Sequence, residues 1–164
     1  MVINGKAGFQ FMGDWAKGEF TAAGKVAGKD FICAPAPGTA KAYTFNIDSF
    51  AMFTQKAADA KKGQLALADA IVSPEFQEVF NLNKGSIPVR PDIPRGKFDA
   101  CAIQSMDDMA ATNKNGGLEP SFAHGMAVAS ATQGAIVDVI AKFMNSNMTS
   151  KDAVAALAKA AKTK

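Results

Sequence analysis

The order in which strand-like and helix-like segments follow one another constrains this chain more than any single motif. Strand-like apolar runs occur only in the first third of the chain, at residues 6–15, 30–39 and 42–53. The third run alternates so that Tyr43, Phe45 and Ile47 share one face and Asp48 lies on the other. No regular alternation of strand and helix follows, so a complete doubly wound sheet is not expected.

From about residue 54 onward, apolar residues recur at helical spacing. The pattern predicts five helices, over 54–72, 73–82, 98–113, 130–146 and 149–162. The second begins with Ser73 as N-cap and Pro74 in its first turn, and either Thr149 or Ser150 caps the last. Three strand candidates are too few to support five helices, because each helix must bury its apolar face. We therefore expect an α/β fold that forms part of a lobe, with its sheet completed by chain outside these residues.

Charge and hydropathy exclude several classes of protein. The formal net charge is +3 and the lysines are scattered, so no nucleic-acid partner is expected. No run approaches the roughly 20 apolar residues of a membrane-spanning helix. The first residues, MVINGKAGFQ, lack the basic and long apolar regions of a signal peptide. The residues alone would place the chain in the cytoplasm.

Motifs of catalysis and cofactor binding are also missing from the sequence. There is no G-x-x-x-x-G-K-[ST], no G-x-G-x-x-G, no G-x-S-x-G and no H-E-x-x-H. A single histidine cannot build a two-histidine metal site within the chain. We expect no catalytic residue, no metal and no cofactor.

The two cysteines, Cys33 and Cys101, lie far apart in sequence and have no His or Cys neighbour, which argues against a zinc site. The residues leave two interpretations open. The thiols are small buried hydrophobes, or, in an oxidising compartment, they form one long-range disulfide.

Four isolated polar or aromatic residues stand at the ends of predicted elements: Trp15, Asp48, Lys84 and His124. Taken singly, each has a structural explanation, as a core indole, a turn cap, a helix C-cap or a buried imidazole. Together they form a set suited to a polyhydroxylated neutral ligand. A sugar stacks its C–H faces on an indole, while its hydroxyls donate to a carboxylate and accept from an ammonium. Such a set orients a ligand without making or breaking a bond, so it favours binding over catalysis.

The motifs GDWAKGEF, APAPGT, SPEFQEVFNLNKGSIPVR and HGMAV resemble the carboxy-terminal part of family 1 extracellular solute-binding proteins of sugar ABC transporters. The resemblance is strongest to the periplasmic glucose/mannose-binding type and covers the chain from about residue 3 to its end. It implies a two-lobe periplasmic-binding-protein fold of type II. Residues 1–164 would be part of the second lobe plus the terminal helices, with the amino-terminal lobe and the signal peptide absent.

The resemblance also implies roles for the four residues. Trp15 resembles an aromatic contact in the sugar cleft, and Asp48 a carboxylate that accepts bonds from sugar hydroxyls. Lys84 and His124 resemble polar contacts from loops that face the cleft. The implied ligand is glucose or a similar hexose, held by lobe closure and delivered to a membrane permease. The implied location is the periplasm, where a Cys33–Cys101 disulfide would be stable.

Two other hypotheses remain open at this stage. One is a small hydrolase that uses His124 with a serine or with Asp48, which requires the imidazole to lie within hydrogen-bond reach of a nucleophile. The other is a stand-alone interaction fragment, because part of a lobe exposes apolar surface.

Overall fold

The structure is a computed structural model that describes residues 1–163. These residues form two compact units. The first consists of Met1–Tyr43 and Ile47–Gly117, and the second consists of Thr44–Asn46 and the chain from Leu118.

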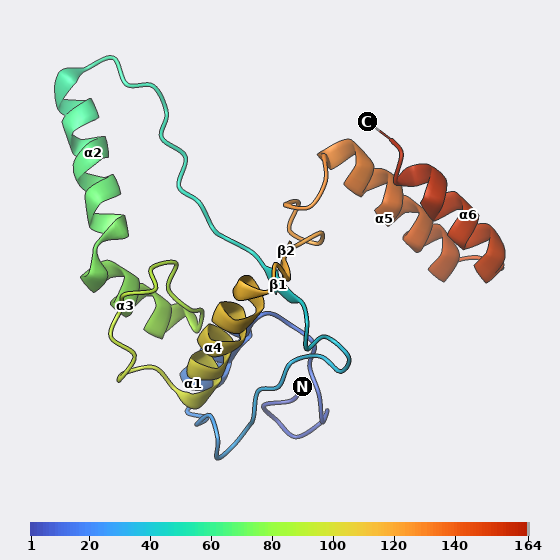
Figure 1. The fold of residues 1–164 in the computed structure, drawn as a ribbon, viewed down its shortest axis with the longest axis horizontal. Helices are drawn as coiled ribbons and strands as arrows, with labels where there is room; N and C mark the ends of the chain where they lie inside the picture. Colours follow the sequence, from blue (N-terminus) through green and yellow to red (C-terminus); the bar gives the residue numbers. More distant parts are fainter. Residues whose placement is uncertain (164) are drawn as a thin grey trace. The chain divides into compact units, whose positions relative to one another are not determined.

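The first unit is mainly helical (Figure 1). Its elements are the 3₁₀ turn η1 (Asp14–Ala16) and the helices α1 (Lys17–Ala22), α2 (Ala58–Val72), α3 (Pro74–Lys84) and α4 (Ala100–Lys114). A small core of three buried residues holds it together, with Ile93, Phe98 and Ala102 at its centre. Half-buried side chains pack around this core: Leu82, Ile87, Ile103 and Met106. The core therefore joins the end of α3, the following loop and the first turns of α4.

Two buried amides on α3 hold the proline-rich loop that follows it. Gln77 donates to the Ile71 carbonyl (2.9 Å) and accepts from the Val89 amide (3.2 Å). Asn81 accepts from the Ser86 hydroxyl at 2.7 Å. Both amides are almost fully buried, at 6% and 5% exposure, so their hydrogen bonds replace those lost to water. The loop is thus ordered by polar contacts where the apolar core is small.

An ion pair joins α1 to the start of α4. The ammonium of Lys17 lies 2.9 Å from the Asp99 carboxylate, and Lys17 is only 7% exposed. The same Asp99 side chain caps α4 by accepting from the Ala102 amide at 2.8 Å. One carboxylate therefore fixes both the start of α4 and the position of α1.

The second unit contains a strand pair and a helical hairpin. The short strands β1 (Tyr43–Phe45) and β2 (Leu118–Pro120) run parallel, and the Ser121 amide donates to the Phe45 carbonyl at 2.8 Å. Helices α5 (Ser130–Met144) and α6 (Ser150–Ala160) pack side by side, as Figure 1 shows. Thr149 caps α6 by accepting from the Asp152 amide at 3.2 Å.

The five predicted helices are confirmed as α2 to α6, with boundaries within a few residues. Ser73 caps α3 as expected, accepting from the Phe76 amide at 3.2 Å. A sixth helix, α1, spans six residues outside the five predicted helix ranges. The mixed fold with few strands agrees with the expectation of a partial lobe.

The strand predictions were largely wrong. Residues 6–13 form no strand and Asp14 starts a 3₁₀ turn, while 30–39 contributes only an isolated bridge between Ala27 and Phe31. The predicted strand 42–53 shrinks to Tyr43–Phe45, and β2 lies outside the three predicted strand ranges. An apolar run becomes a strand only where a neighbouring backbone completes its hydrogen bonds. Within residues 1–163, only β1 and β2 provide such neighbours for each other.

Many large apolar side chains are exposed, including Phe9 (90%), Ile32 (82%) and Phe11 (80%). This agrees with part of a lobe, and the interaction-fragment hypothesis stays a prediction. Over the described residues, none of the helices has the length and apolar character that a membrane span requires.

Cys33 and Cys101 are joined by a disulfide, with their Cα atoms 5.4 Å apart. The bond ties the loop before β1 to the first turn of α4, across a sequence separation of 68 residues. Closing so long a loop removes conformational entropy from the unfolded chain.

We predict that reducing this disulfide, or replacing both cysteines by alanine, lowers the free energy of unfolding by about 4 kcal/mol. Urea unfolding of the oxidised and reduced chains, followed by circular dichroism, measures the difference. Coincident unfolding curves would contradict the prediction.

Candidate functional site

The structure brings two of the four predicted site residues into direct contact. Lys84 is the last residue of α3, and its ammonium forms an ion pair with Asp48, in the loop after β1. The Lys84 ammonium also lies 5.6 Å from the centre of the Phe80 ring, one helical turn earlier. The side chains keep 32% (Lys84) and 58% (Asp48) of their surface exposed. A charged donor and a charged acceptor thus lie together where a ligand can reach both.

The backbone of Trp15 lies close to the end of α3, where Lys84 is. The helix α1 approaches the end of α3 so closely that a Cβ on Gly18 would lie 2.6 Å from the Lys84 carbonyl oxygen. A Cβ on Gly85 would lie 3.1 Å from the Trp15 carbonyl oxygen. Gly85 also has φ of 87°, the left-handed conformation that ends α3. The absence of side chains at Gly18 and Gly85 therefore lets the backbone of η1 and α1 lie against the end of α3 at Lys84. Trp15 itself is half-buried.

His124 belongs to the second unit, in the turn after β2. It is exposed, and its Nδ1 lies 2.7 Å from the Ser121 hydroxyl. Its predicted role as a contact to sugar stays a prediction.

The Ser121–His124 contact bears on the hydrolase hypothesis, since it pairs an imidazole with a hydroxyl. The two residues lie three positions apart in one turn, and Ser121 is only 5% exposed. The contact meets the distance that this hypothesis requires, and the hypothesis stays a prediction. Its short sequence separation is equally typical of a hydrogen bond that stabilises a turn.

A second set of hydrogen bonds, not predicted from the sequence, joins the side chains of Asp14, Ser105 and Tyr43. The Ser105 hydroxyl, on α4, lies 3.4 Å from the Asp14 carboxylate and 2.6 Å from the Tyr43 hydroxyl. A serine has a single hydrogen to donate, and an ionised Asp14 can only accept. Ser105 therefore donates to Asp14, and Tyr43 donates to Ser105. These hydrogen bonds tie η1, α4 and Tyr43 to one another within the first unit.

Burial raises the pKa of the Asp14 carboxyl above its usual value. The positive charge of Lys17, the hydrogen bonds from Ser105 and the Trp15 amide, and the charge of Lys84 all act in the opposite direction. Burial also raises the pKa of Tyr43, and the charges of Asp14 and Asp108 raise it further. Asp14 and Tyr43 are thus coupled electrostatically.

The sequence carried a signal for Asp14 only through its neighbour Trp15 and none for Ser105, which lies within a helix.

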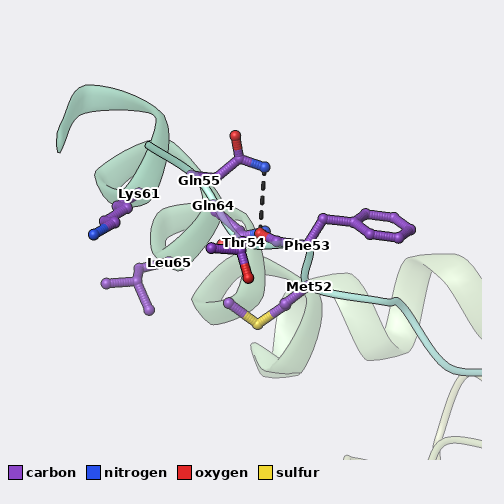
Figure 2. A pocket seen from close by; sticks show the side chains of 7 residues that line it. All are labelled: Met52, Phe53, Thr54, Gln55, Lys61, Gln64 and Leu65. Atoms are coloured by element: carbon purple, nitrogen blue, oxygen red, sulfur yellow. Dashed lines mark hydrogen bonds between the residues drawn. The ribbon is translucent and has the colours of Figure 1, made fainter. Parts of the chain in front are cut away.

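A separate pocket of about 310 Å³ lies between residues 52–55 and α2 (Figure 2). Its lining is mostly apolar and contains none of the four predicted residues. Among residues 1–163, no cluster of three or more His, Cys, Asp or Glu side chains could hold a metal ion.

We predict that Gly18→Ala destabilises the first unit by about 1–3 kcal/mol, because the added methyl group overlaps the Lys84 carbonyl. The fluorescence of Trp15, the chain's only tryptophan, reports the displacement, and thermal unfolding reports the stability. Gly63→Ala is the matched control, since a Cβ at this position in α2 meets nothing within 4 Å. The control should leave stability unchanged or raise it by up to about 1 kcal/mol. Equal behaviour of the two variants would contradict the close approach.

The raised pKa of Asp14 predicts a pH dependence of stability. Between about pH 4, the usual pKa of an aspartate, and its raised pKa, the folded protein binds the proton more tightly than the unfolded chain does. The contribution of Asp14 to the free energy of unfolding is therefore fully present below this pH window and is lost as the pH rises through it. Asparagine does not titrate, so in Asp14→Asn the part of the stability loss that Asp14 causes at rising pH should be absent. Urea unfolding of both proteins at a series of pH values checks the sign, and a difference between them that is independent of pH would contradict it.

Comparisons with known proteins place the chain. No family model matches it. A protein of Brucella suis named a probable sugar-binding periplasmic protein is 51% identical over 154 residues, covering 94% of this chain and 36% of that protein. An uncharacterized ABC transporter extracellular-binding protein of Pyrococcus horikoshii is 33% identical, covering 93% and 33% respectively. A xylose/arabinose-binding protein of Haloferax volcanii is 31% identical, covering 82% and 28%.

These relatives agree with the resemblance carried by the motifs, and their names agree with the periplasmic location it implies. Their names also describe binding proteins rather than enzymes. The chain spans about a third of the length of the relatives it matches. It belongs to the family of extracellular sugar-binding proteins of ABC transporters.

Proposed function

We propose that this chain supplies sugar-contacting residues of a periplasmic binding protein that takes up glucose or a similar monosaccharide for an ABC transporter. The observation that carries the proposal is the Lys84–Asp48 ion pair, held beside η1 and Trp15 by the close approach of α1 to α3. The names of the relatives support a sugar as the ligand.

Binding would proceed by insertion of a sugar hydroxyl between the two charged groups. The hydroxyl donates to Asp48 and accepts from Lys84, so it satisfies both charges with one atom. Both side chains are partly exposed, and an exposed ion pair contributes only about 0–1 kcal/mol, so separating it costs little. The indole of Trp15 would stack on a C–H face of the ring.

In the intact protein, two lobes would close on the sugar, and the closed form would be presented to a membrane permease. His124 would contribute a further polar contact from the second unit. No bond of the sugar is made or broken in this scheme, so the proposed role is transport and not catalysis.

We predict that the chain binds D-glucose, D-mannose or D-xylose, and that Asp48→Ala and Trp15→Ala each weaken binding at least roughly tenfold, as expected when a charge-assisted hydrogen bond or an aromatic contact is removed. Calorimetric titration with each sugar measures the affinities. Asp59→Ala is the control, because that carboxylate lies on α2 with its side chain 99% exposed. Unchanged affinity in both site variants would overturn the assignment of the site.

A further inference from the structure

One face of α3 carries an aromatic ring next to the Lys84 ammonium. Lys84 and Phe80 are four residues apart in this helix, and helical side chains lean towards the N-terminus, so Lys84 extends back over Phe80. The ammonium lies 5.6 Å from the centre of the Phe80 ring, within the range of a cation–π interaction. Phe80 is not one of the four residues predicted from the sequence, yet it contacts one of them.

The ring of Phe80 is fixed by its neighbour one turn earlier in α3. Phe76 and Phe80 stack with their ring centres 5.2 Å apart and their planes inclined by only 13°. Phe80 nevertheless keeps 37% of its surface exposed, so its ring is not enclosed in the apolar core. The ring is therefore held at the surface of the helix, where it can act on the ammonium.

The two partners of Lys84 are held in different ways. Asp48 lies in a loop, outside any helix or strand, and its side chain is 58% exposed. Phe80 belongs to the same helix as Lys84, so the spacing of the two residues is set by helix geometry and not by the placement of a loop. When Asp48 turns to a sugar hydroxyl, the ring of Phe80 stays beside the ammonium.

We propose that Phe80 is a positioning residue of the sugar site, whose ring keeps the Lys84 ammonium in place while a sugar hydroxyl enters between Lys84 and Asp48. This inference rests on the proposed function. Phe80 acts through Lys84 and does not itself need to touch the sugar. A ring face attracts the charge of the ammonium as a whole, so the three N–H donors of Lys84 remain available to Asp48 and to the hydroxyl.

The contact is tested first without a sugar, by NMR of the Lys84 side chain. A ring shifts protons above its face upfield, so the ε-methylene protons of Lys84, identified by their loss in Lys84→Arg, should resonate upfield of those of exposed lysines. Phe80→Leu should move them to the ordinary position, and Phe80→Tyr should keep them upfield. Phe76→Leu is the matched control, because it removes the same ring–ring contact and keeps the ring of Phe80. An unmoved signal in Phe80→Leu would overturn the contact.

The second measurement is calorimetric sugar binding on the 164-residue chain. Phe80→Leu should weaken binding of the best of D-glucose, D-mannose and D-xylose by roughly threefold to tenfold, the scale of one cation–π interaction. Phe80→Tyr should restore the affinity to within about twofold, because a phenol ring also attracts a cation. Phe76→Leu should bind as the unsubstituted chain does.

Urea unfolding of the same variants separates positioning from packing. Phe80→Leu and Phe76→Leu should lose similar stability, since each removes one ring of the stacked pair. A purely structural role of Phe80 predicts that these two variants also have equal sugar affinities, whereas positioning of Lys84 predicts weaker binding in Phe80→Leu alone.

The outcomes distinguish this role from the proposed function. Full affinity in Phe80→Leu, or an equal loss in Phe76→Leu, would overturn the role of Phe80, and weakened binding in Asp48→Ala would then leave the proposed function standing. If the unsubstituted chain bound none of the three sugars, the proposed function would fall for this chain, and the role of Phe80 with it.

Discussion

The first turn of α4 fixes more of the first unit than any other segment. Phe98 and Ala102 belong to the core, and between them Asp99 caps the helix and pairs with the buried Lys17. Cys101, in the same turn, carries the disulfide to the loop before β1. A core of three buried apolar residues is too small to orient four helices alone. The Lys17–Asp99 ion pair, the Asp99 cap and the disulfide at Cys101 add directional restraints to this core. Each of them involves a residue within the five-residue stretch 98–102.

The geometry of the candidate site depends on this first turn of α4. Once α4 is fixed, Ser105 lies one turn farther along the helix, where its hydroxyl accepts a hydrogen bond from Tyr43 and donates one to Asp14. The position of η1 relative to α3 is set by backbone contacts at Gly18 and Gly85. A side chain of η1 can therefore be replaced without moving the turn.

The helices could be predicted from the sequence because their signals are local. Ser73 followed by Pro74 marks the start of α3, and Gly85 its end, independently of the rest of the chain. Strands depend on partners that the local sequence does not specify, and for this reason the run at 6–15 formed no strand. Asp48 and Lys84 were grouped because each stands at the end of a predicted element, but no spacing in the sequence specified that the two side chains touch. The contacts of Asp14 and Ser105 depend on how η1 packs against α4, and no periodicity encodes that packing.

The Lys84–Asp48 pair links stability to the proposed binding. Within the pair, each group supplies the opposite charge that the other needs, so neither is left as a lone charge. Because both side chains are partly exposed, the pair contributes only about 0–1 kcal/mol to stability. Under the proposed function, a sugar hydroxyl therefore separates the two groups at little cost, and its hydrogen bonds to both charges determine the affinity.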